Sequence, residues 1–333
     1  MREAIIKAIN LTKMFGKFVA VDHINFEVYD GEIFGFLGPN GAGKSTTIKM
    51  LTTVLRPTEG TAIVNGYDII KDPAHVRQSI GVVPQEYTAD EDLTGWENIM
   101  MMAGLYGIPK SIADERAKEL LDMVELSFAA NRKVSTYSGG MRRRLEIAMS
   151  LVSRPKVLFL DEPTIGLDAQ TRAAIWNYIK KLKEEYDMTI FVTTHYLEEA
   201  DMYGDRIAII DKGKILAIGS PKELKERVGG DVISLQTTND EEAMKIISSV
   251  TDGILDVKKL EDGIRIKVKG GEEKAPLILE SLLKRGIKVT RMSITEPTMD
   301  EVYMEITGKR MRDEEGSKEE MFAFRRTLRR ARG

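Results

Sequence analysis

The segment Gly38–Ser45 reads Gly-Pro-Asn-Gly-Ala-Gly-Lys-Ser and has the spacing of a phosphate-binding loop. Its glycines let the backbone turn so that successive N–H groups point at one anion, and the following helix N-terminus adds partial positive charge. Lys44 would bring a point charge to the β- and γ-phosphates, and Ser45 offers a hydroxyl to Mg²⁺, which prefers oxygen ligands. We therefore expect a nucleoside triphosphate to contact Gly38, Pro39, Asn40, Gly41, Ala42, Gly43, Lys44, Ser45 and Thr46.

Two adjacent acids, Asp161 and Glu162, follow the apolar run 157–160. A buried strand would carry both carboxylates to the C-terminal edge of an open α/β sheet, where ligands bind, beside the phosphate loop. Asp161 could hold Mg²⁺ through a water molecule, and Glu162 could act as the general base that polarises an attacking water. Loop and acids together predict a site that hydrolyses a nucleoside triphosphate.

The elements that must position these residues alternate between apolar strands and periodic helical segments. This alternation predicts an α/β domain with a largely parallel sheet. The residues between 88 and 153 read as almost wholly helical, which indicates a helical insertion in that domain. The expected strands are 33–37, 157–160, 190–194 and 207–210, and the expected helices include 46–55 and 172–185.

A second domain is expected beyond the boundary at Gly229-Gly230, so the first domain would span residues 1–228 and the second 231–307. The predicted order of elements in the second domain is strand–helix–strand–strand–helix–strand, the order of a small α+β, ferredoxin-like sandwich. Its strands are expected at 232–236, 254–259, 263–268 and 287–294, and its helices at 241–249 and 275–285.

Two arginine-rich segments each allow two interpretations. Residues 308–333 form a basic tail, which is either solvated and mobile or a helix that contacts anionic lipid or a partner. The run Arg142–Arg144 is either a solvated helix face or a contact with a ligand or partner.

Composition excludes several classes of protein. The formal charge of −3 argues against a protein held on nucleic acid by bulk positive charge. No apolar stretch approaches the roughly 18 residues needed to span a bilayer, and the N-terminus lacks the apolar core of a signal peptide. The absence of cysteine removes disulfides, cysteine-based zinc sites and thiol nucleophiles together, and fits a cytosolic protein.

The segment Ser138-Gly139-Gly140-Met141, which lies 23 residues before Asp161, resembles the signature of the ABC ATPases. Tyr137 and Met141 differ from the commonest residues of that signature. The hydroxyl of Ser138 and the N–H groups of the two glycines, at a helix N-terminus, suit a γ-phosphate. The resemblance implies that they bind nucleotide.

Other positions match the same family in order. The resemblance implies that Phe15 stacks on adenine, that Gln85 contacts Mg²⁺ or the water, and that Asp168 belongs to the D-loop. His195 resembles the switch histidine that bridges Glu162, water and the γ-phosphate. The expected catalytic residues are thus Lys44, Glu162 and His195, and the expected metal ligands are Ser45, Gln85 and Asp161.

The segments Thr295–Tyr303 and Tyr137–Arg144 resemble the daunorubicin-resistance branch of the ABC-2 exporters. This resemblance implies a Mg²⁺-dependent ATP-hydrolysing subunit that pairs head to tail with a second copy and energises separate transmembrane permease subunits. The helical insertion would receive the permease helices near Gln85. The chain would lie peripherally on the cytoplasmic face of the cell membrane, with no nucleic-acid partner and with drug or lipid-like cargo. A soluble ABC-type ATPase without a transport role and a ligand-sensing regulator stay open as alternatives.

Overall fold

The computed structural model describes residues 3–250, 253–260 and 263–308. The chain divides into two compact units, which comprise residues 3–218 and 219–308 of this described part. They are called here the first and the second unit. Beyond Gly308, the expected basic tail lies outside the described residues.

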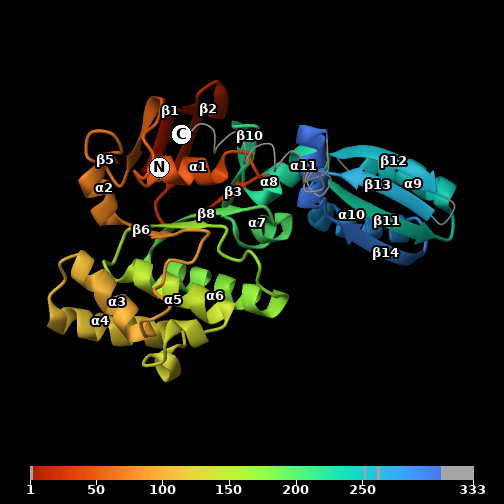
Figure 1. Cartoon of the computed structure of the whole chain (residues 1–333). Helices are drawn as coiled ribbons and strands as arrows, with labels where there is room; N and C mark the ends of the chain where they lie inside the picture. The colour runs from red at the N-terminus through yellow and green to blue at the C-terminus, as the bar shows by residue number, and fades with distance from the viewer. Residues whose placement is uncertain (1–2, 251–252, 261–262, 309–333) are drawn as a thin grey trace. The chain divides into compact units, whose positions relative to one another are not determined.

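A six-stranded sheet lies at the centre of the first unit (Figure 1). The pairings of β6 with β7, β7 with β8, β8 with β3 and β3 with β9 are all parallel, which confirms the predicted α/β sheet. β3 is the strand that leads into the phosphate loop, and β7 ends at Asp161. The strand order is β10 (Lys214–Gly219), β9 (Arg206–Asp211), β3 (Ile33–Leu37), β8 (Thr189–Thr194), β7 (Val157–Asp161) and β6 (Ile80–Val83).

A second, antiparallel sheet in the same unit was not predicted. Its order is β2 (Phe18–Tyr29), β1 (Ala4–Phe15), β4 (Glu59–Val64) and β5 (Tyr67–Asp68). The pairing of β1 with β2 contains four register shifts, each of which breaks the period-two alternation that identifies a strand in a sequence. The irregular pairing therefore explains why sequence patterning did not reveal these long strands.

The parallel sheet is buried on both faces, as alternate residues of β7 show. Leu158 and Leu160 pack into a core shared with the helices of the insertion and α6 (Ala169–Tyr186). Val157 and Phe159 pack into a second core, shared with the antiparallel sheet and α1 (Lys44–Leu51). Figure 1 shows α5 and α6 on one side of the sheet and α1 on the other. The two cores fix the plane from which the loop and the acids project.

The helical insertion has the place expected for it, but its helices are interrupted. They are α3 (Gly95–Leu105), α4 (Lys110–Met123) and α5 (Gly139–Leu151), with two short 3₁₀ turns between α4 and α5. α3 begins with a capping box, in which Thr94 and Glu97 satisfy each other's backbone N–H groups. Two further short helices, α2 (Pro73–Ser79) and α7 (Leu197–Tyr203), complete the first unit.

The second unit contains the predicted strand–helix–strand–strand–helix–strand order. All pairings of its sheet are antiparallel, and the strand order β12-β13-β11-β14 is that of a ferredoxin-like sandwich. The core lies between this sheet and two helices. The elements are β11 (Asp231–Thr237), α9 (Asp240–Val250), β12 (Ile254–Leu260), β13 (Gly263–Val268), α10 (Gly271–Lys284) and β14 (Val289–Thr295).

Two helices of the second unit correct the sequence-based division. α8 (Pro221–Val228), which the expected boundary assigned to the first domain, packs on α11 (Met299–Thr307) in the second unit. A capping box at Ser220 begins α8, so a new element starts about ten residues before the expected boundary. The Gly229-Gly230 pair is a turn inside the unit. α11, which was not predicted as a helix, also begins with a capping box, at Thr298.

The Arg142–Arg144 run is not a solvated face. Arg143 is 1% exposed and donates hydrogen bonds to the carbonyl oxygens of Pro84 (2.7 Å) and Gln85 (2.8 Å). It also forms a 3.0 Å ion pair with Glu146, which is equally buried and accepts from the backbone N–H of Thr88. Burial raises the pKa of Glu146, and Arg143 and Thr88 oppose that effect. The pair therefore attaches the loop after β6 to α5.

We predict that Arg143→Ala destabilises the first unit by about 3–5 kcal/mol, because it leaves the Glu146 carboxylate buried without a cation. Urea unfolding followed by tryptophan fluorescence would measure this, since both tryptophans, Trp96 and Trp176, lie in the first unit. Arg154→Ala is the control, because the Arg154 side chain is 66% exposed in its ion pair and should contribute under about 1 kcal/mol. Equal stability of the two variants would contradict the prediction.

Candidate functional site

The phosphate loop connects β3 to α1 and is packed too closely for side chains at two of its glycines. A Cβ on Gly38 would lie 2.2 Å from the carbonyl oxygen of Ile210. Gly43 has φ of +107°, and a Cβ there would lie 2.6 Å from the carbonyl oxygen of Ala20. These positions need glycine because a Cβ there would clash with the backbone of neighbouring strands.

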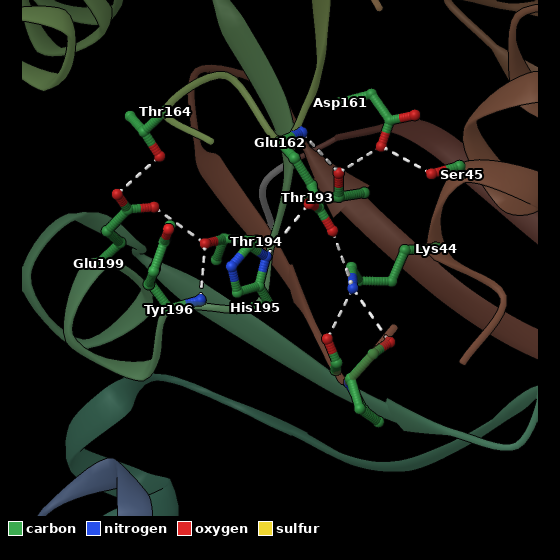
Figure 2. A network of polar contacts seen from close by, with 12 residues as sticks. Lys44, Ser45, Asp161, Glu162, Thr164, Thr193, Thr194, His195, Tyr196 and Glu199 are labelled. Atoms are coloured by element: carbon green, nitrogen blue, oxygen red, sulfur yellow. Dashed lines mark hydrogen bonds and ion pairs between the residues drawn. The ribbon is translucent and has the colours of Figure 1, made fainter. Parts of the chain in front are cut away.

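Lys44 begins α1 and points back into the loop (Figure 2). Its side chain is 4% exposed, and Nζ donates to the carbonyl oxygens of Gly38 (2.6 Å) and Pro39 (3.1 Å). Nζ also lies 3.0 Å from Oε1 of Glu162. The buried ammonium is therefore compensated by two dipoles and one carboxylate, as a buried charge must be.

Asp161, the last residue of β7, accepts two hydroxyl hydrogen bonds at one carboxylate oxygen. Ser45 donates at 3.0 Å and Thr193 at 2.7 Å (Figure 2). Burial raises the pKa of Asp161, and these two hydroxyls oppose the rise. The described residues contain no cluster of three or more acidic, histidine or cysteine ligands. A hydroxyl beside one carboxylate suits Mg²⁺ that completes its shell with water and phosphate.

Glu162 is the junction of the site. It adopts φ of +49°, is 4% exposed, and its Oε2 accepts from Nδ1 of His195 at 3.1 Å while Oε1 faces Lys44. Burial raises the pKa of Glu162, but the hydrogen bond with His195 and the charge of Lys44 outweigh burial and lower this pKa to about 2. Glu162 is therefore ionised throughout the physiological range, in a backbone conformation that non-glycine residues seldom adopt.

The structure brings five of the predicted side chains into one cluster at the phosphate loop, and it places Phe15, Gln85, Ser138 and Asp168 elsewhere in the first unit. The cluster comprises Lys44, Ser45, Asp161, Glu162 and His195. Phe15 is half-buried at the end of β1, and the side chain of Gln85 is exposed in the loop after β6. Ser138 caps α5 by accepting from the N–H of Met141, and Asp168 caps α6 by accepting from Thr171.

The signature glycines lie where α5 meets the start of α6. A Cβ on Gly140 would lie 2.5 Å from Cγ2 of Thr171, and one on Gly139 would lie 3.5 Å from Cδ2 of Leu167. Ser138 and Asp168 are exposed at these two helix starts. Hydrogen bonds from Thr171 lower the pKa of Asp168. The close contact with Thr171 explains Gly140 by helix packing, and the Ser138 side chain stays open to solvent.

Sequence reasoning missed the threonines that support the acids. Thr193 lies opposite Asp161 in the parallel pairing of β7 with β8. Its hydroxyl donates to Asp161 and accepts from the backbone N–H of Glu162 at 3.0 Å, so one side chain orients both acids. The only sequence signal for this role of Thr193 is its place at the end of an apolar strand, because the sequence does not show how the two strands are paired in register.

We predict that Glu162 makes the free energy of unfolding depend on pH in the acidic range. Its pKa of about 2 lies below the ordinary value of 4.5, so its contribution is present above pH 4.5 and is lost as pH falls toward 2. The difference in unfolding free energy between the wild type and Glu162→Gln should fall by about 2 kcal/mol when the pH is lowered from 5 to 3. Urea unfolding of both chains at each pH measures the difference. A constant difference would show that Glu162 is not held ionised.

Two family descriptions match the chain. Residues 21–165 match ABC transporter, and residues 219–307 match the C-terminal domain of DrrA1-3-like ATP-binding proteins. The chain is 40% identical over 325 residues to the daunorubicin/doxorubicin resistance ATP-binding protein DrrA of Streptomyces peucetius. The matched region covers 96% of this chain and 98% of that protein. The linearmycin resistance ATP-binding protein LnrL of Bacillus subtilis is 38% identical over 314 residues, or 93% and 100% of the two chains.

Solved structures of similar fold agree with these matches. The dimeric post-hydrolysis structure of the ATP-binding cassette MJ0796 with ADP and Pi has a TM-score of 0.59 at 30% identity, over 65% of this chain and 98% of that chain. CbiO1 of Clostridium perfringens has a TM-score of 0.63 at 28% identity, over 68% and 93%. Within the part of the chain that the structure describes, no helix combines the length and apolarity needed to cross a membrane. The chain belongs to the ABC transporter family, as an ATP-binding and ATP-hydrolysing subunit of the branch that carries a DrrA-like C-terminal domain.

Proposed function

We propose that this chain is the nucleotide-binding subunit of an ABC-2 type exporter of drug-like or lipid-like molecules, and that it acts through separate transmembrane subunits. The single observation that carries the catalytic part is the buried cluster in which Glu162 contacts both Lys44 and His195. Resemblance to resistance proteins over nearly the whole chain, including the second unit, supports the export role.

Mg²⁺ would be held by Ser45 and Asp161, and the family resemblance adds Gln85 as a further ligand. When bound, the ion would neutralise charge on the phosphates and orient them. The donor set fits this role because Oγ of Ser45 and Oδ1 of Asp161 already lie 3.0 Å apart, and oxygen is the ligand that Mg²⁺ prefers.

ATP binding would also change Glu162. Lys44 now divides its charge between the loop carbonyls and Glu162, and the phosphates of ATP would compete for it. A carboxylate with a pKa of about 2 is a weak base. Moving the ammonium onto phosphate removes one cause of that low pKa. Glu162 would then accept a proton from the attacking water more readily, while His195 keeps it oriented.

A second copy of the chain would complete each site. Ser138 is exposed at the start of α5, and within the described part of the chain its hydroxyl would give up only the capping hydrogen bond with the N–H of Met141. The signature of one copy would meet the ATP held by the phosphate loop of the other, with Asp168 nearby and Phe15 against adenine. The dimeric form of the similar cassette MJ0796 supports this arrangement.

The transmembrane subunits would contact the helical insertion and would hold the chain on the cytoplasmic face of the membrane. Apolar side chains that reach solvent there include Leu105, 76% exposed at the end of α3, and Phe128, 72% exposed between α4 and α5. Exposed apolar surface of this kind favours a protein partner.

Affinity purification of the tagged chain from detergent-solubilised membranes of its own cell tests the export role. We expect a stoichiometric polytopic membrane protein to co-purify, and ATP hydrolysis by the complex. The tagged Glu162→Gln chain is the matched control, since it should retain the partner and lose turnover. Recovery of an active ATPase without any membrane protein would favour the soluble alternative and would contradict this proposal.

We predict that Ser138→Arg lowers ATPase activity by roughly 100-fold, the cost of losing one transition-state donor, while ATP affinity of the single chain changes by less than about twofold. Ser111→Arg, on the exposed start of α4, is the control for added charge and bulk. Steady-state hydrolysis and titration of monomer with a fluorescent ATP analogue give the two values. Loss of affinity in the monomer would mean that Ser138 does not act in the partner's site.

A further inference from the structure

Another buried carboxylate lies beside the site. Glu199, in the first turn of α7, is 6% exposed, and each of its oxygens accepts one threonine hydroxyl. Thr164 donates to Oε1 at 2.7 Å and Thr194 donates to Oε2 at 2.9 Å (Figure 2). The carboxylate thus bridges two segments that are 30 residues apart in the sequence.

These two segments carry the catalytic pair. Thr164 lies two residues after Glu162, and Thr194 directly precedes His195. Both threonines are at most 2% exposed, so bulk solvent does not compete for their hydroxyls. Leaving a buried carboxylate oxygen without a donor is costly, and the bridge therefore restricts how far the segments can separate.

Thr194 makes a further contact on the histidine side. Its Oγ1 accepts from the backbone N–H of Tyr196 at 3.0 Å while it donates to Glu199. The Tyr196 ring lies 4.1 Å from the His195 ring, centroid to centroid, and the Arg172 guanidinium lies over that tyrosine at 4.8 Å. The backbone on both sides of His195 is therefore held by one hydroxyl, and the imidazole has little freedom to leave Glu162.

We propose that Glu199 is a positioning residue for ATP hydrolysis: by holding Thr164 and Thr194 it fixes the Glu162–His195 hydrogen bond without contacting nucleotide. This inference rests on the proposed role of Glu162 and His195 in hydrolysis. It assigns a role in turnover to three residues that no sequence motif singled out here.

The proposal distinguishes positioning from mere stability through two isosteric pairs of variants. Thr164→Val and Thr194→Val remove a hydroxyl while keeping shape, and Thr164→Ser and Thr194→Ser restore it. Thr194→Val should have the larger effect, because it removes both the bond to Glu199 and the acceptor for Tyr196. Thr52→Val is the matched control, since Thr52, the residue that follows α1, is 3% exposed and its hydroxyl donates to the carbonyl oxygen of Ile48.

Steady-state ATPase assays on the full chain test this. We expect each valine variant to lower kcat by roughly 10-fold to 100-fold with KM for ATP nearly unchanged, since displacing a catalytic group by about 1 Å costs that much. Each serine variant should recover most of kcat, and Thr52→Val should match the wild type. In a Glu162→Gln background, Thr194→Val should change the residual rate little, because both substitutions act on one step.

Ring signals of His195 give a second readout that does not depend on activity. The chain has only three histidines, so NMR signals of His195 are assignable with a His195→Gln chain. They should shift in the valine variants and stay unchanged in Thr52→Val. If folded valine variants keep kcat within about twofold of wild type, the positioning role is wrong while the proposed function stands. Absence of hydrolysis by the wild type would instead overturn the proposed function.

Discussion

The ion pair between Lys44 and Glu162 is the interaction on which the site depends. Both side chains are almost completely buried, and their charged atoms lie 3.0 Å apart. A buried charge is stable only while it is paired, so neither group can lose the other without a substitute. In the proposed mechanism the phosphates of ATP would supply that substitute for Lys44, and His195 supplies part of it for Glu162. Under this proposal, binding of ATP and preparation of Glu162 as the base would be linked through one shared ammonium group.

The rest of the first unit keeps this pair in place. Burial of the parallel sheet on both faces holds the ends of β3, β7 and β8 at one edge, where the loop, the acids and His195 meet. Strand neighbours fix the loop so closely that Gly38 and Gly43 admit no side chain. Arg143 attaches the segment with Gln85 to α5, the helix that Ser138 caps. Movement of α5 would therefore carry Gln85 with it.

Much of the fold and of the candidate site was predictable, because these features depend on residues that are close together in the sequence. The phosphate loop, the acids at the end of a strand and the ferredoxin-like order of the second unit follow from residue types and spacing within short windows. The boundary at Gly229-Gly230 was wrong because two glycines signal a turn without saying which unit the turn belongs to. The nucleotide contacts of all the predicted site residues stay predictions. Within one copy of the chain, Phe15, Gln85, Ser138 and Asp168 lie outside the cluster around Lys44, and Ser138 and Asp168 cap helices there.

The sequence alone predicted which groups would cluster as a candidate catalytic site: an amine, a hydroxyl, two carboxylates and an imidazole, each at the end or start of a predictable element. Only the tertiary structure decided which neutral residues orient them. Thr193 reaches Asp161 through the register of two strands, and Glu199 in α7 reaches Thr164 in the loop after β7 and Thr194 at the end of β8. The physical reason is that a hydroxyl's role depends on what lies within about 3 Å of it. That neighbour is chosen by packing between segments, which no spacing along the chain records.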